Sequence, residues 1–345
     1  MPVTTAKGLA PHLYTDPQVF ALERERIFRG GWCAVARSDA LPGPNTYLAF
    51  ELNGDPLVVT HASSGEIAAF SNVCLHRACP VAEGRGTARG GVLSCPYHRW
   101  TYSLDGCLRG APHMEQAVEF DKRAERLPPL AAEEWQGWIF VNTDPDATPL
   151  APALEPLTRA LAPFRERMKE FAALEFPSAW NWKVMIDNFM ESYHVFAAHP
   201  GTLEPVYPAA ATYGEPLDDG PFVPLENPSV VPSIGALWVA CVFPSMIFAV
   251  TRGERPLVAW YDMQIRSHDY FDLTIRLLGH EEVTRDPPAA EQSAAIARAI
   301  HVEDIRMCEN VWRGLHSSYA RAGRLSHLEE STWQFHEWWR SRMDA

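Results

Sequence analysis

Two short motifs that mix cysteine with histidine constrain this chain more than any other feature. Cys74-Leu75-His76 and Cys95-Pro96-Tyr97-His98 are separated by eighteen residues. A zinc finger usually places two cysteines in one half of its site and two histidines in the other. Here each half offers one of each, which favours a two-iron cluster whose cysteines hold one iron and whose histidines hold the other. Taken alone, the four residues also fit a structural zinc site.

The composition predicts a globular protein of about two domains. The chain has 345 residues, 47% of them hydrophobic and 21% charged. Its formal net charge of −13 argues against nucleic acid or an anionic membrane as the main partner. Seven cysteines without a regular framework favour reduced thiols and a cytoplasmic location. No signal peptide is evident, and the longest apolar stretch, 235–250, is interrupted by Pro244 and too short to span a bilayer.

The first part of the chain predicts a helical segment followed by a small antiparallel β domain. Asp16-Pro17 opens an amphipathic helix that ends at Gly30-Gly31, so we assign 1–31 to an N-terminal helical segment. From 32 to 145, short apolar runs alternate with turns such as Asn53-Gly54. We expect this domain to carry the Cys–His motifs at its tip.

The second part, 146–345, predicts an α+β domain. Residues 143–163 are rich in Pro, Ala and Asp and indicate a connector. We expect one helix over 181–198 and a long one over about 290–320. Strands are expected at 236–250 (as two strands), 256–266 and 269–278.

A second metal site is indicated by charged residues in the 181–198 helix. Asp187, Glu191 and His194 are spaced so that they share one helix face. His199 lies five residues after His194, which an ideal helix would rotate away. It precedes Pro200, however, and a residue before proline is disfavoured in the helical region. The helix is therefore expected to end there and to let the two histidines approach one metal.

Asp304 supplies the third candidate ligand. It interrupts a spaced set of residues on the long helix that we expect to face the core: Ile296, Ile300, Asp304, Cys308, Val311 and Leu315. A buried carboxylate is costly unless it is paired or bound to metal. Two histidines and one carboxylate with open positions are typical of a non-haem iron(II) oxygenase. His301 and Glu303 are second choices, and a buried salt bridge from Asp304 to Arg298 or Arg306 is the alternative.

The two sites together, in this order, resemble the Rieske non-haem iron oxygenases, specifically their catalytic α subunit. The matching stretches run over nearly the whole chain: 72–77, 95–102, 181–183, 187–194, 199–200, 303–309 and 314–315. The combination is highly specific, whereas any one stretch alone would not be. Among these relatives, the chain looks most like the α-only members that act on quaternary amines of the carnitine or betaine type.

The resemblance implies cofactors, fold and assembly. It implies a [2Fe–2S] cluster on Cys74, His76, Cys95 and His98, and a mononuclear Fe(II) on the two histidines and the aspartate. It also implies a catalytic domain with a helix-flanked antiparallel sheet of the helix-grip (START-like) kind. A homotrimer is implied, in which a carboxylate bridges a cluster histidine of one subunit to an iron histidine of the next. Glu191 matches that carboxylate, and Asp187 is the alternative.

The same resemblance implies an oxygenase supplied with electrons by an NAD(P)H-dependent flavin or iron–sulfur reductase, with or without a ferredoxin. We expect it to use O₂ to hydroxylate or oxidatively demethylate a small substrate, either a quaternary amine or an aromatic acid. Monooxygenation is favoured over cis-dihydroxylation of an aromatic ring by a dioxygenase. Candidate pocket residues, which by default pack in the core, are Met185, Trp238, Phe243, Phe248, Trp260 and Trp312.

Two departures from the family pattern stand out. The two cluster motifs are slightly further apart than expected, and Trp312 occupies a position where we expect a polar residue. Two other classes of protein remain open from the residues. A Rieske electron carrier would need only about the first 150 residues. A zinc-stabilised ligand-binding protein would need no redox cluster.

Overall fold

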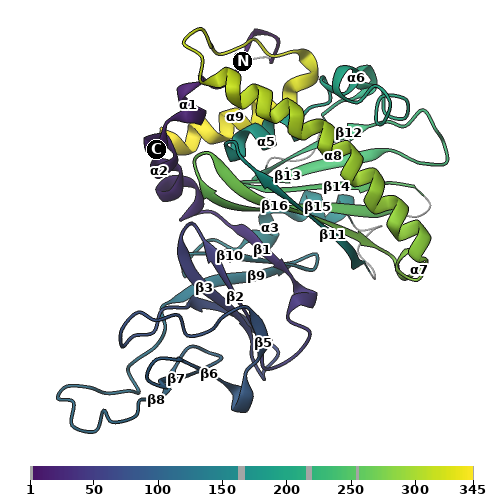
Figure 1. Cartoon of the computed structure of the whole chain (residues 1–345). Coiled ribbons are helices and arrows are strands. Elements are labelled where there is room, and N and C mark those ends of the chain that lie inside the picture. The colour runs from purple at the N-terminus through teal and green to yellow at the C-terminus, as the bar shows by residue number, and fades with distance from the viewer. Residues whose placement is uncertain (1–2, 162–167, 215–219, 254–255, 345) are drawn as a thin grey trace. The chain divides into compact units, whose positions relative to one another are not determined.

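The computed structural model describes residues 3–161, 168–214, 220–253 and 256–344, which fall into two compact units (Figure 1). The first, here called the β unit, is Arg29–Ala151. The second, the α+β unit, joins Met1–Phe28 with Pro152–Ala345. The β unit is therefore inserted in sequence between two segments of the α+β unit.

The β unit is built from two antiparallel sheets. The larger has the strand order β1-β10-β9-β4-β3-β2-β5 and the smaller β6-β7-β8. Between β2 and β3, Asn53 and Gly54 both have positive φ (56° and 84°), as the tight turn predicted from Asn-Gly requires. The strands are β1 Cys33–Arg37, β2 Thr46–Leu52, β3 Asp55–His61, β4 Ile67–Ser71, β5 Arg85–Thr87, β6 Val92–Ser94, β7 Thr101–Ser103, β8 Leu108–Gly110, β9 Pro129–Trp135 and β10 Trp138–Asn142.

The α+β unit is a six-stranded antiparallel sheet flanked by helices, with the order β11-β16-β15-β14-β13-β12 (Figure 1). Its strands are β11 Lys169–Ser178, β12 Phe222–Asn227, β13 Leu237–Val242, β14 Met246–Thr251, β15 Leu257–Ser267 and β16 Tyr270–Gly279. Its helices are α1 His12–Thr15, α2 Pro17–Glu23, α4 Glu155–Leu161, α5 Trp182–Phe189, α6 Val195–Ala198, α7 Glu281–Thr284, α8 Pro287–Leu315 and α9 Glu330–Met343. The predicted α+β class with antiparallel sheets is confirmed.

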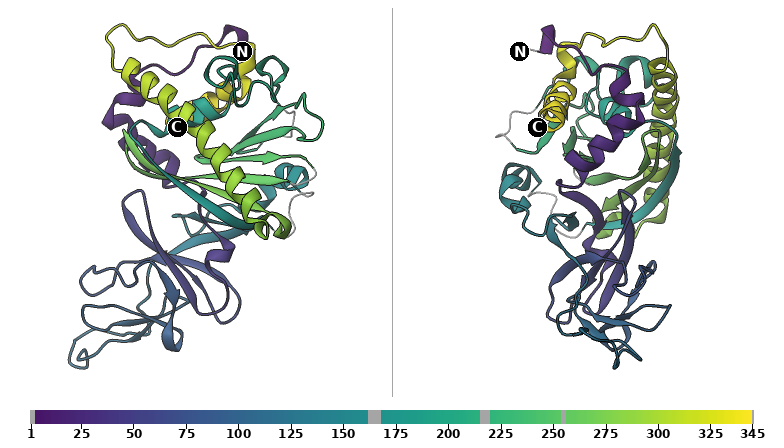
Figure 2. Two further views of the ribbon diagram at one scale, coloured as in Figure 1. Left: turned by 45° about the vertical axis from the view of Figure 1, so that its right-hand side comes forward. Right: turned by 90° about the vertical axis from the view of Figure 1, so that its left-hand side faces the viewer.

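A buried charged network joins the two ends of the chain to α5. Glu23 of α2 accepts hydrogen bonds from Lys183 Nζ (2.5 Å), Trp182 Nε1 (2.9 Å) and Trp339 Nε1 of α9 (2.7 Å). Glu23 and Lys183 are both completely buried. Figure 2 shows α1 and α2 (purple) beside α9 (yellow). The network thus ties α5 and α9 to the same carboxylate of α2, and it leaves neither buried charge without a partner.

Some sequence expectations need correction. The stretch 143–163, predicted to be a connector, does contain the boundary between the two units, at Ala151 and Pro152, but it also forms α3 (Leu150–Ala153) and α4; its last residues, 162 and 163, lie outside the described part. Strands β11 and β12 and helix α9 were not predicted. The long helix begins at Pro287, with Asp286 as its N-cap.

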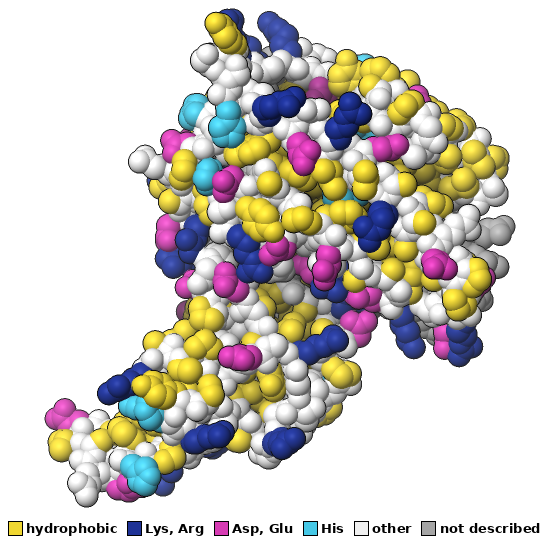
Figure 3. Space-filling view, viewed as in Figure 1, with side chains coloured by type: hydrophobic (Ala, Val, Ile, Leu, Met, Phe, Trp, Pro, Cys, Tyr) yellow, Lys and Arg dark blue, Asp and Glu magenta, His cyan; other side chains and the backbone are white. Residues whose placement is uncertain are grey.

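The surface shows no segregation of charge on the face drawn in Figure 3, where Lys and Arg lie among Asp and Glu. Within the described residues, none of the helices combines the length and the apolar character that crossing a bilayer demands.

Candidate metal centres

The two Cys–His motifs lie on loops with the same backbone geometry. Ala78 N–H donates to Cys74 O (3.0 Å), and Arg99 N–H donates to Cys95 O (3.1 Å). Both Ala78 and Arg99 have positive φ, 54° and 60°, which is uncommon outside glycine. Each loop therefore turns back on itself four residues after its cysteine, although the two histidines follow at different spacings.

These loops bring the two candidate histidine ligands together and bury the two cysteines in one core cluster. Cys74 and Cys95 are buried, His76 is half-buried and His98 is exposed. The Nδ1 atoms of His76 and His98 lie 3.1 Å apart, and the ring of His76 stacks on Trp100 at 5.1 Å. Two facing imidazole nitrogens at that separation are both within reach of one metal ion. Two buried thiols and two outward imidazoles fit the donor set of a Rieske cluster.

Tyr102 is a cluster-loop residue that we did not single out from the sequence. Its hydroxyl lies 3.3 Å from Cys74 Sγ and accepts a hydrogen bond from Leu75 N–H (3.1 Å). The first loop is also closed by Asn72, whose side chain exchanges hydrogen bonds with the Ala82 backbone (2.8 and 2.9 Å). Hydrogen bonds to cluster sulfurs are one way in which a protein sets the reduction potential.

The second site begins where the predicted 181–198 helix breaks, which corrects that prediction. Helix α5 ends at Phe189, and α6 starts only at Val195. In between, Glu191 Oε2 accepts the backbone N–H of His194 (3.1 Å), so its carboxylate stabilises the start of the next helix. Glu191 and His194 therefore do not share a continuous helix face with Asp187.

His199 follows the expectation drawn from the proline. It is the C-cap of α6, with non-helical φ and ψ of −120° and 44°, and Pro200 follows it. Its side chain is almost fully buried, and its ring centroid lies 5.2 Å from that of His194. The helix end thus turns His199 back towards His194.

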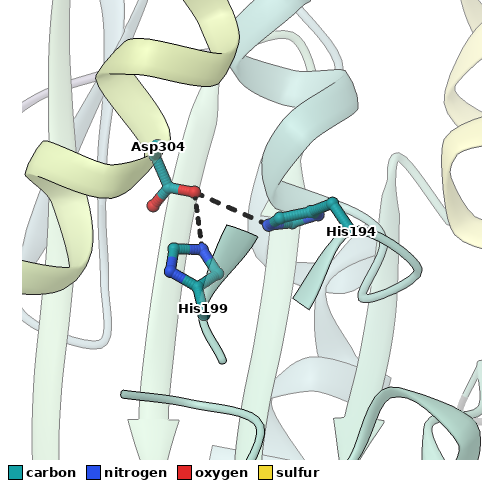
Figure 4. A group of neighbouring side chains, drawn as sticks. All are labelled: His194, His199 and Asp304. Carbon is teal, nitrogen blue, oxygen red and sulfur yellow. Dashed lines mark hydrogen bonds and ion pairs between the residues drawn. The ribbon is translucent and has the colours of Figure 1, made fainter. Parts of the chain in front are cut away.

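Asp304, from the middle of α8, completes the group (Figure 4). Its Oδ1 lies 2.9 Å from His199 Nε2 and 3.5 Å from His194 Nε2. One potential ligand atom from each of the three residues lies within 4.8 Å of the others. Asn188 Nδ2 donates to the same oxygen (3.0 Å). Among the described residues, the Asp304 side chain therefore contacts the two histidines and Asn188, and its predicted alternative, a salt bridge to Arg298 or Arg306, is not formed.

The electrostatics of this group suit a bound cation. Burial opposes ionisation of Asp304, but hydrogen bonds from the two histidines outweigh it and hold its pKa well below the usual range. Burial likewise opposes protonation of His194, yet Asp304 and Glu191 raise its pKa to about 10. Three carboxylates, those of Glu191, Glu303 and Asp304, surround two imidazoles. A divalent cation bound to this group would replace the protons through which the two histidines contact Asp304.

The helix around Asp304 is less buried than the apolar spacing predicted. His301, Asp304 and Cys308 are buried, but Ile296 and Val311 are about half exposed. With 3.6 residues per turn, Ile296 lies about 80° around the helix axis from Asp304. Of the second-choice ligands, Glu303 contacts His199 from the other side of its ring, at Nδ1. His301 packs against Phe176, with ring centroids 4.5 Å apart.

Asp187 lies in a different environment from Glu191. Its carboxylate accepts a hydrogen bond from Tyr14 Oη (2.5 Å) and lies 2.8 Å from His336 Nε2. Glu191 instead faces His194, with Oε1 2.5 Å from Nδ1. Asp187 is therefore engaged with the two ends of the chain.

The predicted pocket residues are placed mostly in the core. Met185, Trp238, Phe248 and Trp260 are buried with at most 1% of their surface exposed, and Phe243 is 6% exposed. Trp238 packs on Phe248, Phe243 on Trp338, and Trp312 on His316. Trp312 is only half-buried. Their role as substrate contacts stays a prediction.

Family comparisons agree with this geometry. The family profile described as "Rieske [2Fe-2S] domain" matches residues 31–128. The profile described as "Ring hydroxylating alpha subunit (catalytic domain)" matches 165–230 and 223–345. Together they span both candidate metal centres.

Similar proteins include the carnitine monooxygenase oxygenase subunit of Acinetobacter baumannii, 31% identical over 90% of this chain and 86% of that protein. Choline monooxygenase of Amaranthus tricolor is 29% identical over 94% of this chain and 75% of that protein. Among solved structures, the quaternary ammonium Rieske monooxygenase CntA in complex with L-carnitine has a TM-score of 0.86 at 27% identity, covering 99% of this chain and 97% of that one. The chain therefore belongs to the Rieske-type ring-hydroxylating oxygenases, as a catalytic α subunit that carries a [2Fe–2S] domain.

Proposed function

We propose that this chain is the terminal oxygenase that hydroxylates or oxidatively demethylates a quaternary amine, using O₂ and electrons from a reductase. The observation that carries the proposal is the convergence of His194, His199 and Asp304 in a chain related to carnitine, betaine and choline monooxygenases. Two imidazoles and one carboxylate are the ligand set of a non-haem iron(II) oxygenase.

We propose that these three residues hold one Fe(II) and that Cys74 and Cys95, with two histidines, hold the cluster. When bound, the cluster and the iron would supply the electron transfer and the activation of O₂. The protein residues position these groups. Asp304 is buried and ionised, so its carboxylate would bind a cation without first having to lose a proton.

The exposed imidazole of His98 suggests the route by which electrons leave the cluster. We propose a homotrimer in which Glu191 accepts hydrogen bonds from His98 of one subunit and from His194 of the next. In this chain Glu191 already contacts His194 through both of its oxygens. Asp187 is a weaker candidate because Tyr14 and His336 occupy its carboxylate.

Aromatic side chains near Asp304 support a quaternary ammonium substrate. Tyr261 packs edge-on against Phe189, with ring centroids 4.3 Å apart. Burial and the nearby charge of Asp304 raise the pKa of Tyr261, whose phenol is neutral at pH 7 even at its ordinary pKa of about 10. Neutral aromatic faces attract a methylated ammonium group by cation–π contact. We propose that these two rings form part of the substrate site.

The remaining parts of the proposal concern organisation. We propose functional domains over 1–31, 32–145 and 146–345, the first packing with the third. The redox partner would be an NAD(P)H-dependent flavin or iron–sulfur reductase, and the enzyme would work in the cytoplasm.

The test combines metal analysis with substrate screening. Anaerobically purified, dithionite-reduced protein should give a Rieske EPR signal and contain one iron beyond the two of the cluster. With a reductase and NAD(P)H, carnitine, glycine betaine or choline should stimulate O₂ uptake with formation of a hydroxylated or demethylated product. If O₂ uptake is stimulated by an aromatic acid instead, the substrate is an aromatic acid and not a quaternary amine. A cis-diol product would show that the enzyme is a dioxygenase and not a monooxygenase. Zinc without a cluster would end the oxygenase proposal.

A further inference from the structure

Each histidine of the His194–His199–Asp304 group has a carboxylate on its far ring nitrogen, but the two carboxylates differ. His194 Nδ1 lies 2.5 Å from Glu191 Oε1, and His199 Nδ1 lies 2.7 Å from Glu303 Oε2. Both rings therefore direct Nε2 towards Asp304. Glu191 belongs to the segment that precedes His194 directly. Glu303 comes from α8, 104 residues after the histidine that it contacts.

Glu303 is itself held in place by a second residue. Thr202 Oγ1 donates a hydrogen bond to Glu303 Oε2 (2.6 Å), the oxygen that also meets His199. The turn after Pro200 brings Thr202 back, because its backbone N–H donates to His199 O (3.3 Å). The His199 side chain is 1% exposed and that of Glu303 33%. One carboxylate oxygen thus ties the histidine and the turn after it to the helix that bears Asp304.

We propose that Glu303, held by Thr202, is the positioning residue for His199 at the metal centre. This inference rests on the proposed function, since it needs a metal on the three ligands. A carboxylate that accepts the Nδ1 proton of a ligating histidine fixes its tautomer and ring orientation and increases the basicity of Nε2. Glu303 cannot be a ligand in place of Asp304 in this arrangement, because it occupies the opposite edge of the ring.

The carboxylates of Glu191 and Glu303 would then have different roles. Glu191 is proposed to face a neighbouring subunit, so its hydrogen bond to His194 is open to change when the cluster is reduced. Glu303 is instead tied to two residues that follow α6, His199 and Thr202. One imidazole would therefore be held constant while the other responds to the redox partner.

The experiment measures metal affinity instead of turnover. The purified full chain, with its cluster intact and its mononuclear metal removed by a chelator, is dialysed against graded Co²⁺, and bound cobalt is quantified. We expect Glu303→Ala to weaken Co²⁺ binding about 10- to 100-fold, and Glu303→Gln to weaken it less because the amide oxygen can still accept from Nδ1–H. The EPR spectrum of bound high-spin Co²⁺, recorded with the cluster oxidised and diamagnetic, should change in both variants.

Thr202→Val separates positioning from general packing. It should weaken binding a few-fold alone and add nothing in the Glu303→Ala background, since it acts through the same carboxylate. Glu309→Gln, an exposed glutamate on the same helix, is the matched control and should bind Co²⁺ like the wild type.

Glu303→Ala binding within twofold of the wild type, with an unchanged Co²⁺ spectrum, would overturn the inference while leaving the metal centre in place. Thr202→Val adding its full effect in the Glu303→Ala background would also overturn it. If Asp304→Ala binds Co²⁺ as tightly as the wild type, the metal centre is wrong and the inference falls with it. Visible absorption of the cluster and far-UV circular dichroism confirm that each variant is folded.

Discussion

The two candidate metal centres of this chain are assembled in opposite ways. The cluster ligands come from one stretch, Cys74 to His98, on two loops that repeat the same backbone turn. The other group combines the short helix α6 with α8, so that His199 meets Asp304 across 105 residues of sequence. A site carried by one stretch can be read from its motif. A site made by convergence depends on the fold that brings its parts together.

If the two centres are independent, each can be removed without the other, with complete loss of reductase-driven turnover in both cases. We expect Asp304→Ala to lose the mononuclear metal and to keep the cluster, because Asp304 lies with the two histidines in the α+β unit, whereas the candidate cluster ligands belong to the β unit. Cys95→Ala should lose the cluster and still bind a divalent metal at the other site. Iron quantification with EPR checks both.

Asp304→Ala with unchanged iron content would reject it as a ligand. Loss of the cluster in Asp304→Ala, with the fold preserved, would show that the two sites are coupled.

The site formed by His194, His199 and Asp304, here called the convergent site, should also depend on packing between distant parts of the chain, whereas the cluster should not. We expect Glu23→Ala to destabilise the α+β unit by about 3–5 kcal/mol, since it leaves Lys183 buried with its partner removed. Burial already lowers the pKa of Lys183, against the opposing effect of Glu23. Urea unfolding followed by tryptophan fluorescence measures the change, and the Rieske EPR signal reports on the β unit.

A Glu23→Ala variant as stable as the wild type would mean that water or another group takes over the interaction with Lys183. Replacing both residues by apolar side chains of similar size should recover part of the loss.

In the proposed function, Glu191 links the two centres across a subunit interface. We expect Glu191→Ala to keep both metals but to slow oxidation of the reduced cluster by substrate and O₂ about 10- to 100-fold. Stopped-flow absorbance in a single turnover measures the rate. Asp187→Asn is the comparison, because that carboxylate contacts Tyr14 and His336. It should alter stability more than transfer.

A normal rate in Glu191→Ala together with a slow rate in Asp187→Asn would assign the bridge to Asp187.

The smallest effect concerns His301, which lies beside the convergent site. Burial lowers its pKa to about 4, so the unfolded chain takes up its proton first as the pH falls. Stability from this group is therefore present above about pH 6.5 and is lost as the pH falls towards 4. We expect a loss of about 2 kcal/mol between pH 7 and 5, absent in His301→Phe. Urea unfolding at both values, on the wild type and the variant, measures it.

An equal pH dependence in His301→Phe and the wild type would show that His301 is not the titrating group.

Sequence reasoning reached the parts of the fold that local pattern controls. Asn53-Gly54 and Asp16-Pro17 marked a turn and a helix start where the structure has them. His199 was expected outside its helix because Pro200 follows, and it is the C-cap there. The geometry of the Cys–His loops is set locally, since each loop is closed by hydrogen bonds between residues that are close in the sequence.

The misses have two physical causes: a local side-chain hydrogen bond that competes with the helix, and contacts between residues far apart in the sequence. Glu191 and His194 fit a continuous helix by spacing, but the backbone instead breaks at Met190, and the Glu191 carboxylate takes up the His194 N–H. Glu303 could not be recognised as a partner of His199, because nothing local indicates that its carboxylate meets Nδ1. The half-exposed positions of Ile296 and Val311 on α8 also depend on packing that apolar spacing alone did not reveal.

The contact between Glu23 and Trp339 has a consequence for how the protein is made. The two residues are 316 positions apart, with the whole β unit between them. At a synthesis rate of about 5–20 residues per second, roughly 15–60 s separate their emergence from the ribosome. During that interval the β unit is complete and can fold, whereas Glu23 still waits for α9. We therefore expect the [2Fe–2S] domain to be ready for cluster insertion before the α+β unit closes.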